Sequence, residues 1–216
     1  MSEKDKLTEE IIFEAATDEF LDKGMDGARM QNIADKAGIN KALLHYYYRT
    51  KDKMFNTVFE KIAEKILAKF APVFDEKLTL EEKIRFFYKE HITFLQNNPR
   101  LPAFILNEIN RNPARLRRLL SNIDINYLWN KIEEQHRDEL ARYNITKEKI
   151  PQIMTTIAAI SVFPFAARGI FEELFRKIDI SFDEYLEERK EFAADFVIKA
   201  LMRQEVTGVT RDKEVG

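Results

Sequence analysis

Apolar residues recur at spacings of three and four along most of the 216-residue chain, a pattern that predicts α-helices rather than strands. The first apolar stripe consists of Ile12, Ala15, Ala16, Phe20 and Leu21. It predicts a helix from about Thr8 to Lys23, with Thr8 as the N-cap. Gly24 follows directly, and a glycine in this position favours the left-handed conformation that ends many helices.

The segment from Met30 to Lys53 carries two short helical patterns separated by a glycine. The first predicted helix covers 30–36 and the second covers 41–47, with Gly38 at the reversal and Asn40 as the N-cap of the second. Two short helices joined by a tight turn are typical of the helix-turn-helix, whose second helix enters the DNA major groove.

Helical patterns continue to the C-terminal region. Thr50 is the expected N-cap of a long fourth helix that reaches about Phe70. Further helices are predicted at 80–97, 101–111, 113–121, 124–142, 146–177 with a kink at Pro164, and from Ser181 onward with Phe192 and Phe196 in its apolar stripe. Capping boxes at Thr79–Glu82 and Ser181–Glu184 mark two of the starts. We find no strand pattern and no internal repeat.

Composition supports an all-α fold. The hydrophobic fraction of 45% suffices for a core, while six glycines and six prolines are few for a chain that would need many turns. Cysteine is absent, so no disulfide or thiolate metal site can form. The N-terminal residues lack the apolar core of a signal peptide, and no apolar run approaches about 18 residues. We therefore expect a soluble cytoplasmic protein with no membrane partner.

Charge is distributed unevenly although the formal net charge is only −2. The stretch from Arg29 to Lys53 holds basic residues at 29, 36, 41, 49, 51 and 53, against acidic residues at 35 and 52. Screening limits distant charges to a reach of about 8–10 Å, so this local excess can attract DNA phosphates.

The outward face of the third helix supplies the candidate DNA contacts. Tyr47 and Tyr48 are expected in the core, while Asn, Lys, His and Tyr side chains can reach phosphates or base edges and Ala or Leu can contact thymine methyls. The predicted DNA-binding residues are Arg29, Gln31, Asn40, Lys41, Ala42, Leu43, His45, Tyr46 and Lys51. Among these we expect Arg29, Lys41, Tyr46 and Lys51 to hold phosphates.

Residues 8–56 resemble the TetR/AcrR family of bacterial transcriptional regulators. The matching positions are Ala15-Ala16, Phe20, Gly24, Met30, Ile33-Ala34, Ala37-Gly38-Ile39, Lys41, Leu44, Tyr47-Tyr48, Lys51 and Met54-Phe55. The resemblance implies a helical homodimer that binds a near-palindromic operator, is released by a small-molecule effector, and most often represses transcription. The chain departs from the family pattern at Ala28-Arg29, Ala42-Leu43 and His45, which affects operator sequence rather than fold.

We predict an N-terminal three-helix DNA-binding unit at 1–52, with its motif at about 29–48, and a larger helical ligand-binding and dimerisation domain at 53–204. A polar tail follows at 205–216. The fourth helix is expected to join the two domains rigidly. Dimerisation is expected through 150–204, where small residues alternate with large ones. A small apolar or amphipathic effector is expected to contact Phe94, Phe104, Asn107, Trp129, His136 and Phe163.

Enzymatic functions receive no support from the sequence. The three histidines, His45, His91 and His136, are widely separated and lack HExxH spacing, and neither a glycine-rich phosphate loop nor a GxSxG motif is present. We expect no catalytic residues, no metal and no cofactor. The alternative to a DNA-binding regulator is a helical protein that binds small molecules or docks to proteins without binding DNA.

Overall fold

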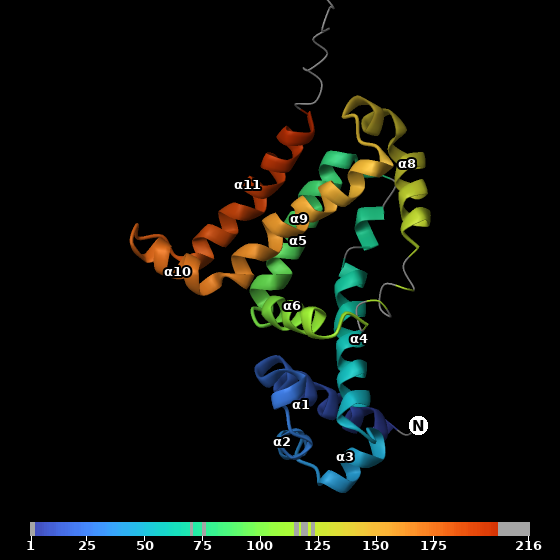
Figure 1. Cartoon of the computed structure of the whole chain (residues 1–216), viewed down its shortest axis with the longest axis vertical. Coiled ribbons are helices and arrows are strands. Elements are labelled where there is room, and N and C mark those ends of the chain that lie inside the picture. Colours follow the sequence, from blue (N-terminus) through green and yellow to red (C-terminus); the bar gives the residue numbers. More distant parts are fainter. Residues whose placement is uncertain are drawn as a thin grey trace, which may run out of the picture. The chain divides into compact units, whose positions relative to one another are not determined.

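The structure, a computed structural model, describes residues 3–69, 71–74, 77–114, 117, 121 and 124–202. Its elements are α1 (Glu3–Gly27), α2 (Met30–Lys36), α3 (Lys41–Tyr47), α4 (Lys51–Lys69), η1 (Ala71–Phe74), α5 (Leu80–Asn97), α6 (Leu101–Arg111), α8 (Ile125–Arg142), η2 (Lys147–Lys149), α9 (Ile150–Ala166), α10 (Arg168–Arg176) and α11 (Phe182–Met202) (Figure 1). No strand occurs among these residues, which confirms the all-α fold class.

The chain forms two compact units. Unit 1 comprises residues 1–69 and 98–123, so that α6 packs with the N-terminal helices. Unit 2 comprises residues 70–97 and 124–216. The rigid link through α4 and the domain boundaries at 52 and 204 stay predictions.

Unit 1 is organised around the apolar face of α1. Both α2 and α4 pack against α1, and α6 contacts it as well. The buried core includes Ile12, Ala16, Phe20, Ile33, Leu44, Met54, Phe55, Val58 and Phe104. The Phe55 ring is in edge contact with Phe20, with centroids 4.9 Å apart, and lies 5.7 Å from Phe104. This aromatic cluster joins α1, α4 and α6 and thereby supports the shorter helices that α1 carries.

Unit 2 is built on a long pairing of α5 with α11, and α9 packs against both. Its main core consists of Tyr88, Ile92, Leu95, Phe165, Phe182, Leu186, Ala193, Ala194, Val197 and Ile198. The alanines let the two long helices approach each other closely. A smaller cluster of Trp129, Leu140 and Ile145 adds α8 to the unit.

Side-chain caps occur at most of the predicted helix starts. The Asn40 oxygen accepts from the Leu43 N–H at 2.8 Å, and the Thr50 hydroxyl accepts from the Lys53 N–H at 3.2 Å. Asp124 caps α8 in the same way. The Thr79–Glu82 and Ser181–Glu184 capping boxes are confirmed by reciprocal bonds. The local signals for these helix starts were therefore sufficient.

The predicted start of the first helix was wrong. Thr8 lies inside α1, which begins at Glu3, because acidic and basic residues before Thr8 continue the helix without a capping signal. Gly24, by contrast, has φ of 65° and interrupts the helical conformation where the sequence predicted.

The predicted helix from Thr146 to Lys177 is divided at Ala167, where φ is −108° and ψ is 24°. As predicted, the helical segment α9 continues through Pro164, and a kink at this proline stays a prediction. Proline lacks the N–H that would bond to the Ile160 carbonyl. The Arg189 guanidinium on α11 donates to that oxygen instead, at 3.0 and 3.2 Å, which satisfies the carbonyl and allows the helix to continue.

Two aromatic residues of the last helix do not lie in the core. Phe192 is 64% exposed and Phe196 is 55% exposed, although the pattern placed both in the apolar stripe with Leu186 and Val197. The predicted helix at 113–121 and the tail at 205–216 lie mostly or wholly outside the described residues.

The helical stretch Lys147–Ala166 is long and apolar enough by composition to cross a membrane, with a mean hydropathy of 1.2. Only 17% of the stretch is buried, and its large apolar side chains Met154 and Phe163 are exposed. Helices of soluble proteins also meet this criterion, so a single such helix does not define a membrane protein.

Candidate nucleic-acid interface and ligand cavity

The helix-turn-helix has the bounds that the sequence predicted, with α2 at 30–36 and α3 at 41–47. Gly38 adopts φ of 65° at the turn, a conformation that costs other residue types free energy. Ile33, Ala34 and Leu44 are fully buried and fasten both helices to unit 1. The outer face of α3 is thereby left toward solvent.

Every predicted contact residue at the start of α3 and on its outer face is exposed. These residues are Asn40, Lys41, Ala42, Leu43, His45 and Tyr46. Tyr46 is 80% exposed, and its ring meets Tyr47 edge to face at 5.5 Å, which props it outward. Tyr48 is buried and Tyr47 is half-buried. The exposed set combines hydrogen-bonding, cationic and apolar groups on one short helix, as a reader of base edges requires.

Two predicted contact residues are partly engaged within the protein. The Gln31 amide donates to Asp35 at 2.8 Å along α2. The His45 Nδ1 atom lies 3.3 Å from the Arg49 carbonyl oxygen, to which the tautomer protonated at Nδ1 donates. Each side chain keeps a second polar atom that can reach DNA.

Cationic side chains lie on α3 and on the neighbouring segments of the helix-turn-helix region. Arg29, Lys41, Arg49 and Lys53 are exposed, and none forms an ion pair with a carboxylate in the described part of the chain. Sequence reasoning counted Arg49 and Lys53 among the basic residues but did not assign them to the site. Cations without a protein partner are free to neutralise phosphates.

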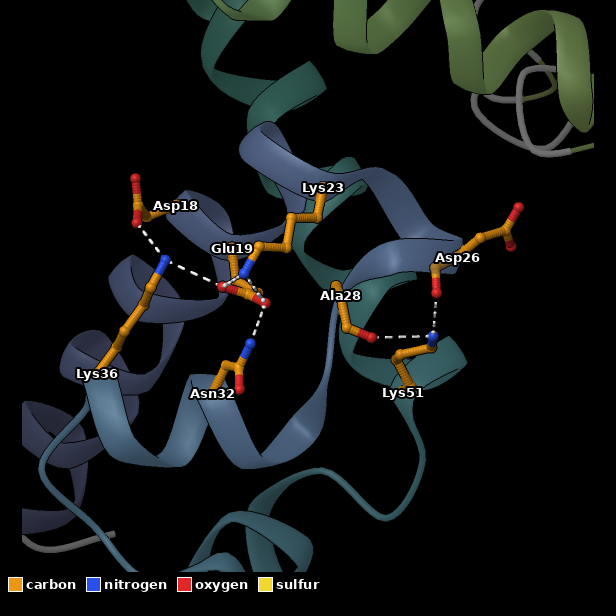
Figure 2. Close-up of polar contacts among 8 residues, drawn as sticks. All are labelled: Asp18, Glu19, Lys23, Asp26, Ala28, Asn32, Lys36 and Lys51. Atoms are coloured by element: carbon orange, nitrogen blue, oxygen red, sulfur yellow. Dashed lines mark hydrogen bonds and ion pairs between the residues drawn. The ribbon is translucent and has the colours of Figure 1, made fainter.

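Lys51 has a structural role in addition to the one predicted. Its ammonium donates to the Ala28 carbonyl at 3.1 Å and to the Asp26 carbonyl at 3.3 Å, as Figure 2 shows. These bonds hold the start of α4 to the connection between α1 and α2. One of the three ammonium donors remains for a phosphate.

Glu19 is a fully buried carboxylate that joins α1 to α2 (Figure 2). It accepts from the Asn32 amide at 2.9 Å and lies 3.0 Å from the Lys36 ammonium and 3.2 Å from the Lys23 ammonium. Burial alone would raise the pKa of Glu19, but the hydrogen bonds from Asn32, Lys36 and Lys23 outweigh burial and lower it to about 2. The carboxylate therefore stays ionised and fixes α2 on α1.

A second carboxylate extends this network to α6. Asp18 lies 2.6 Å from Lys36 of α2 and 2.8 Å from Arg100 at the start of α6. At the other end of α6, Arg111 pairs with Asp26 at 2.7 Å. Between them, the buried Glu108 accepts from the Met25 N–H at 3.3 Å, directly after the Gly24 break. Three polar contacts thus fasten α6 along the C-terminal half of α1.

Sequence reasoning missed Glu19, Asp18 and their partners. One local signal was available, because Glu19 follows Ala15 by four residues and therefore lies on the buried face of the first helix. A carboxylate at such a position requires cationic or hydrogen-bonding partners. The partners themselves come from residues that are distant in sequence and are identified only by the fold.

Unit 2 contains an apolar cavity of about 370 Å³, here called the unit 2 cavity. Its walls come from α5, α8 and α9, and include Ile84, Phe87, Trp129, Ile153 and Ile157. The polar residues along it are Lys83, Tyr88 and His91, all on α5. The volume lies at the lower end of the range typical of small-molecule sites.

The six predicted ligand residues do not come together in the structure. Trp129 lines the unit 2 cavity. His136 is buried and contacts Glu139 at 2.6 Å, at a kink in α8, and Phe94 packs against the main core of unit 2. Phe163 is 59% exposed. Phe104 lies in the core of unit 1 and Asn107 is exposed there, so neither lines the unit 2 cavity.

The exposed α3 face, its capped N-terminus and the nearby cations without ion pairs among the described residues are features of a helix-turn-helix DNA-binding unit. Residues 12–58 match the family model of bacterial regulatory proteins of the tetR family. The N-terminal segment of the chain is therefore similar to the helix-turn-helix segment of the TetR family of transcriptional regulators.

Relatives with assigned names agree with this family. The chain is 45% identical over 56 residues to the HTH-type transcriptional repressor SCO4008 of Streptomyces coelicolor. The aligned segment covers 26% of this chain and 29% of that protein. It is 26% identical over 151 residues to the nucleoid occlusion factor SlmA of Vibrio vulnificus. The aligned segment covers 68% of this chain and 74% of that protein. Three of the curated relatives are matched over only 29%, 60% and 36% of their length.

The fold agrees with solved structures as well. A TetR transcription regulator from Haloarcula marismortui superposes with a TM-score of 0.63 at 20% identity, covering 90% of this chain and 98% of that one. Because the superposition covers 90% of this chain, the shared helical fold includes more than the N-terminal unit.

Proposed function

We propose that the protein is a ligand-responsive transcriptional repressor that binds a near-palindromic operator as a homodimer and is released by a small-molecule effector. The observation that carries the proposal is the exposed outer face of α3, together with exposed cations of the same region that form no ion pair within the described residues. The side chains of this face are exposed and are therefore not part of the core of unit 1. The match of residues 12–58 to the tetR family model and a named repressor among the relatives support this function.

Within this proposal, the contact residues divide by chemistry. Lys41, Arg29 and Tyr46 hold phosphates, and the last donor of Lys51 adds to them. Asn40, Ala42, Leu43 and His45 face base edges. Residues 1–52 act as the DNA-binding domain and 53–204 as the regulatory domain, in the cytoplasm where the operator is.

The dimer contact is assigned to α9, α10 and α11. Ile170, Leu174 and Ile178 follow one face of α10 and its C-terminal end at four-residue intervals, and all three are exposed. On α11, the exposed Phe192 and Phe196 rings stack with centroids 6.4 Å apart. Apolar rows of this kind on neighbouring elements are typical of surfaces that a second subunit covers. A symmetric dimer places two α3 helices on successive half-sites.

The effector is assigned to the unit 2 cavity, because apolar clefts with a few polar groups are the usual ligand sites of helical domains. The alternative remains a small-molecule-binding or protein-docking helical protein that does not bind DNA. In that case the α3 face would carry no affinity for duplex DNA.

The test is binding to the DNA upstream of the protein's own gene, measured by fluorescence anisotropy at several salt concentrations. Wild-type protein is expected to bind this fragment more tightly than a scrambled duplex. Lys41→Ala should weaken binding to both duplexes and lower the salt-dependence slope by about one unit, because one phosphate contact is lost.

Lys89→Ala is the matched control, because Lys89 is an exposed lysine of α5 in unit 2, outside the proposed dimer contact. It should leave both affinity and slope unchanged. No preference of the wild type for the upstream fragment, or an equal slope for Lys41→Ala and Lys89→Ala, would refute the assignment.

A further inference from the structure

A single helical turn, Gly24–Ala28, leads from the break in α1 to the start of α2. Gly24 has φ of 65° and ψ of −178°, outside the helical region, and the Ala28 N–H then donates to the Gly24 carbonyl at 3.2 Å. Gly24 therefore occupies the N-cap position of this turn. An N-cap side chain usually supplies an acceptor to the first N–H groups, and glycine has no side chain to do so.

Glu108 supplies an acceptor to this turn from α6. The residue is only 2% exposed, and its carboxylate accepts from the N–H of Met25, the first residue after Gly24, at 3.3 Å. Its Oε1 atom lies 3.6 Å from the position that a Cβ on Gly24 would occupy. A negative charge at the start of a helical turn is also favoured by the helix dipole. The buried carboxylate thus caps the turn that glycine leaves uncapped.

The other end of the same turn holds Lys51. The Asp26 and Ala28 carbonyls accept from the Lys51 ammonium at 3.3 and 3.1 Å (Figure 2). Arg29 follows directly, is exposed, and has the extended backbone from which α2 begins. In the proposed function both Lys51 and Arg29 hold phosphates. A displacement of the turn would therefore displace two phosphate contacts together.

We propose that Glu108 is a positioning residue for DNA binding, which fixes the Gly24–Ala28 turn and thereby places Lys51 and Arg29 for their phosphates. The proposal rests on the proposed function, because it assigns Glu108 a role in DNA binding. A carboxylate repels phosphate, so loss of its charge would by itself strengthen binding. Positioning predicts the opposite sign, namely weaker binding when the carboxylate is removed.

Glu108→Leu in the full-length protein tests this sign, because leucine fills the buried site but cannot accept a hydrogen bond. We would measure binding to the upstream DNA fragment by fluorescence anisotropy at several salt concentrations. Affinity should fall by about fivefold or more, and the salt-dependence slope should fall by about one unit, because phosphate contacts are lost. A variant that is merely less stable has fewer folded molecules but the same slope. Unchanged or tighter binding, or an unchanged slope, would overturn the proposal.

Two further variants separate the hydrogen bond from other effects of the substitution. Glu108→Gln keeps an oxygen that can accept from the Met25 N–H, so its affinity and slope should stay close to those of the wild type. Asn110→Leu introduces the same leucine at an exposed position of α6 and should also bind as the wild type does. A loss in either variant as large as that in Glu108→Leu would contradict the assigned role.

A double-mutant cycle tests whether Glu108 acts through Lys51. In the Lys51→Ala background one of the two contacts is already absent, so Glu108→Leu should weaken DNA binding by a clearly smaller factor than in the wild type. The same factor in both backgrounds would show that Glu108 does not place Lys51.

Amide hydrogen exchange without DNA tests the turn itself. In Glu108→Leu the amides of residues 25–29 should exchange about fivefold faster or more, while those of 12–20 in α1 should keep their rates. Unchanged exchange at 25–29 would remove the basis of the proposal. If the wild type binds no duplex, the proposed function fails, and the exchange rates alone decide whether Glu108 fixes the turn.

Discussion

Glu19 shows how a single residue fixes the orientation of the DNA-reading helices. Its carboxylate is buried in unit 1 and holds Asn32 and Lys36 of α2, while α2 in turn positions α3 through Ile33 and Leu44. The pKa of about 2 means that folding favours the ionised form by about 3 kcal/mol relative to an ordinary glutamate.

We expect Glu19→Gln to destabilise unit 1 by about 2–3 kcal/mol at pH 7, measured by urea unfolding. Because the folded-state pKa lies below the ordinary value of 4.5, the contribution is complete above about pH 4.5 and disappears as pH falls toward 2. The gap between wild type and variant should therefore narrow on acidification. Glu14→Gln, at an exposed position of α1, is the control and should cost little at any pH. A gap that stays constant from pH 7 to 2.5 would contradict the assigned role of the charge.

Whether the sequence could predict the role of a site residue depended on whether the interactions of that residue are local. The exposure of Lys41, His45 and Tyr46 followed from the helical period and the buried Leu44, both visible in the sequence. Lys51 could be predicted as a cation near the site, but its bonds to Asp26 and Ala28 span more than twenty residues. Only the packing of α4 against α1 brings these atoms together.

At the scale of helices, short-range signals predicted the helix bounds accurately. Contacts between residues that are distant in sequence could not be predicted. Asn40 and Gly38 determined the bounds of α3 because a cap and a left-handed glycine act within one turn. The break at Ala167 was not predicted, and neither was the contact by which Arg189, 25 residues after Pro164, donates to the Ile160 carbonyl that the proline leaves unpaired. The cavity residues were also unpredictable, since core and cavity aromatics have the same sequence pattern.

The Pro164–Arg189 relation gives a prediction for a double-mutant cycle. Arg189→Met should destabilise unit 2 by about 1.5–3 kcal/mol in the wild-type background, because the Ile160 carbonyl loses a charged donor. Pro164→Ala restores a backbone N–H that can bond to this carbonyl within the helix. In the Pro164→Ala background, Arg189→Met should therefore cost clearly less, as measured by urea unfolding. Equal costs in the two backgrounds would show that Arg189 acts mainly through its contact with the Tyr185 ring.

At the scale of the whole molecule, the exposed aromatic residues of α11 connect the fold to operator binding. Sequence reasoning placed Phe192 and Phe196 in the apolar stripe because a buried core face and a subunit interface have the same composition. Their exposure in the single chain is the reason that the proposed dimer contact includes them. A dimer with two helix-turn-helix units gains affinity for an operator with two half-sites, because binding of the second unit becomes intramolecular once the first unit is bound.

We expect the double variant Phe192→Lys, Phe196→Lys to be monomeric, with the 25.5 kDa mass of one chain by light scattering, while the wild type shows twice that mass. The fold should survive, because both side chains are exposed within the chain and charged residues there meet solvent. Affinity for the two-half-site operator should fall by about a hundredfold or more, whereas affinity for a single half-site should hardly change. Tyr127→Lys, at an exposed aromatic position of α8, is the control and should stay dimeric. A double variant that remains dimeric would exclude α11 from the interface, and a monomer with undiminished operator affinity would show that the two reading helices act independently.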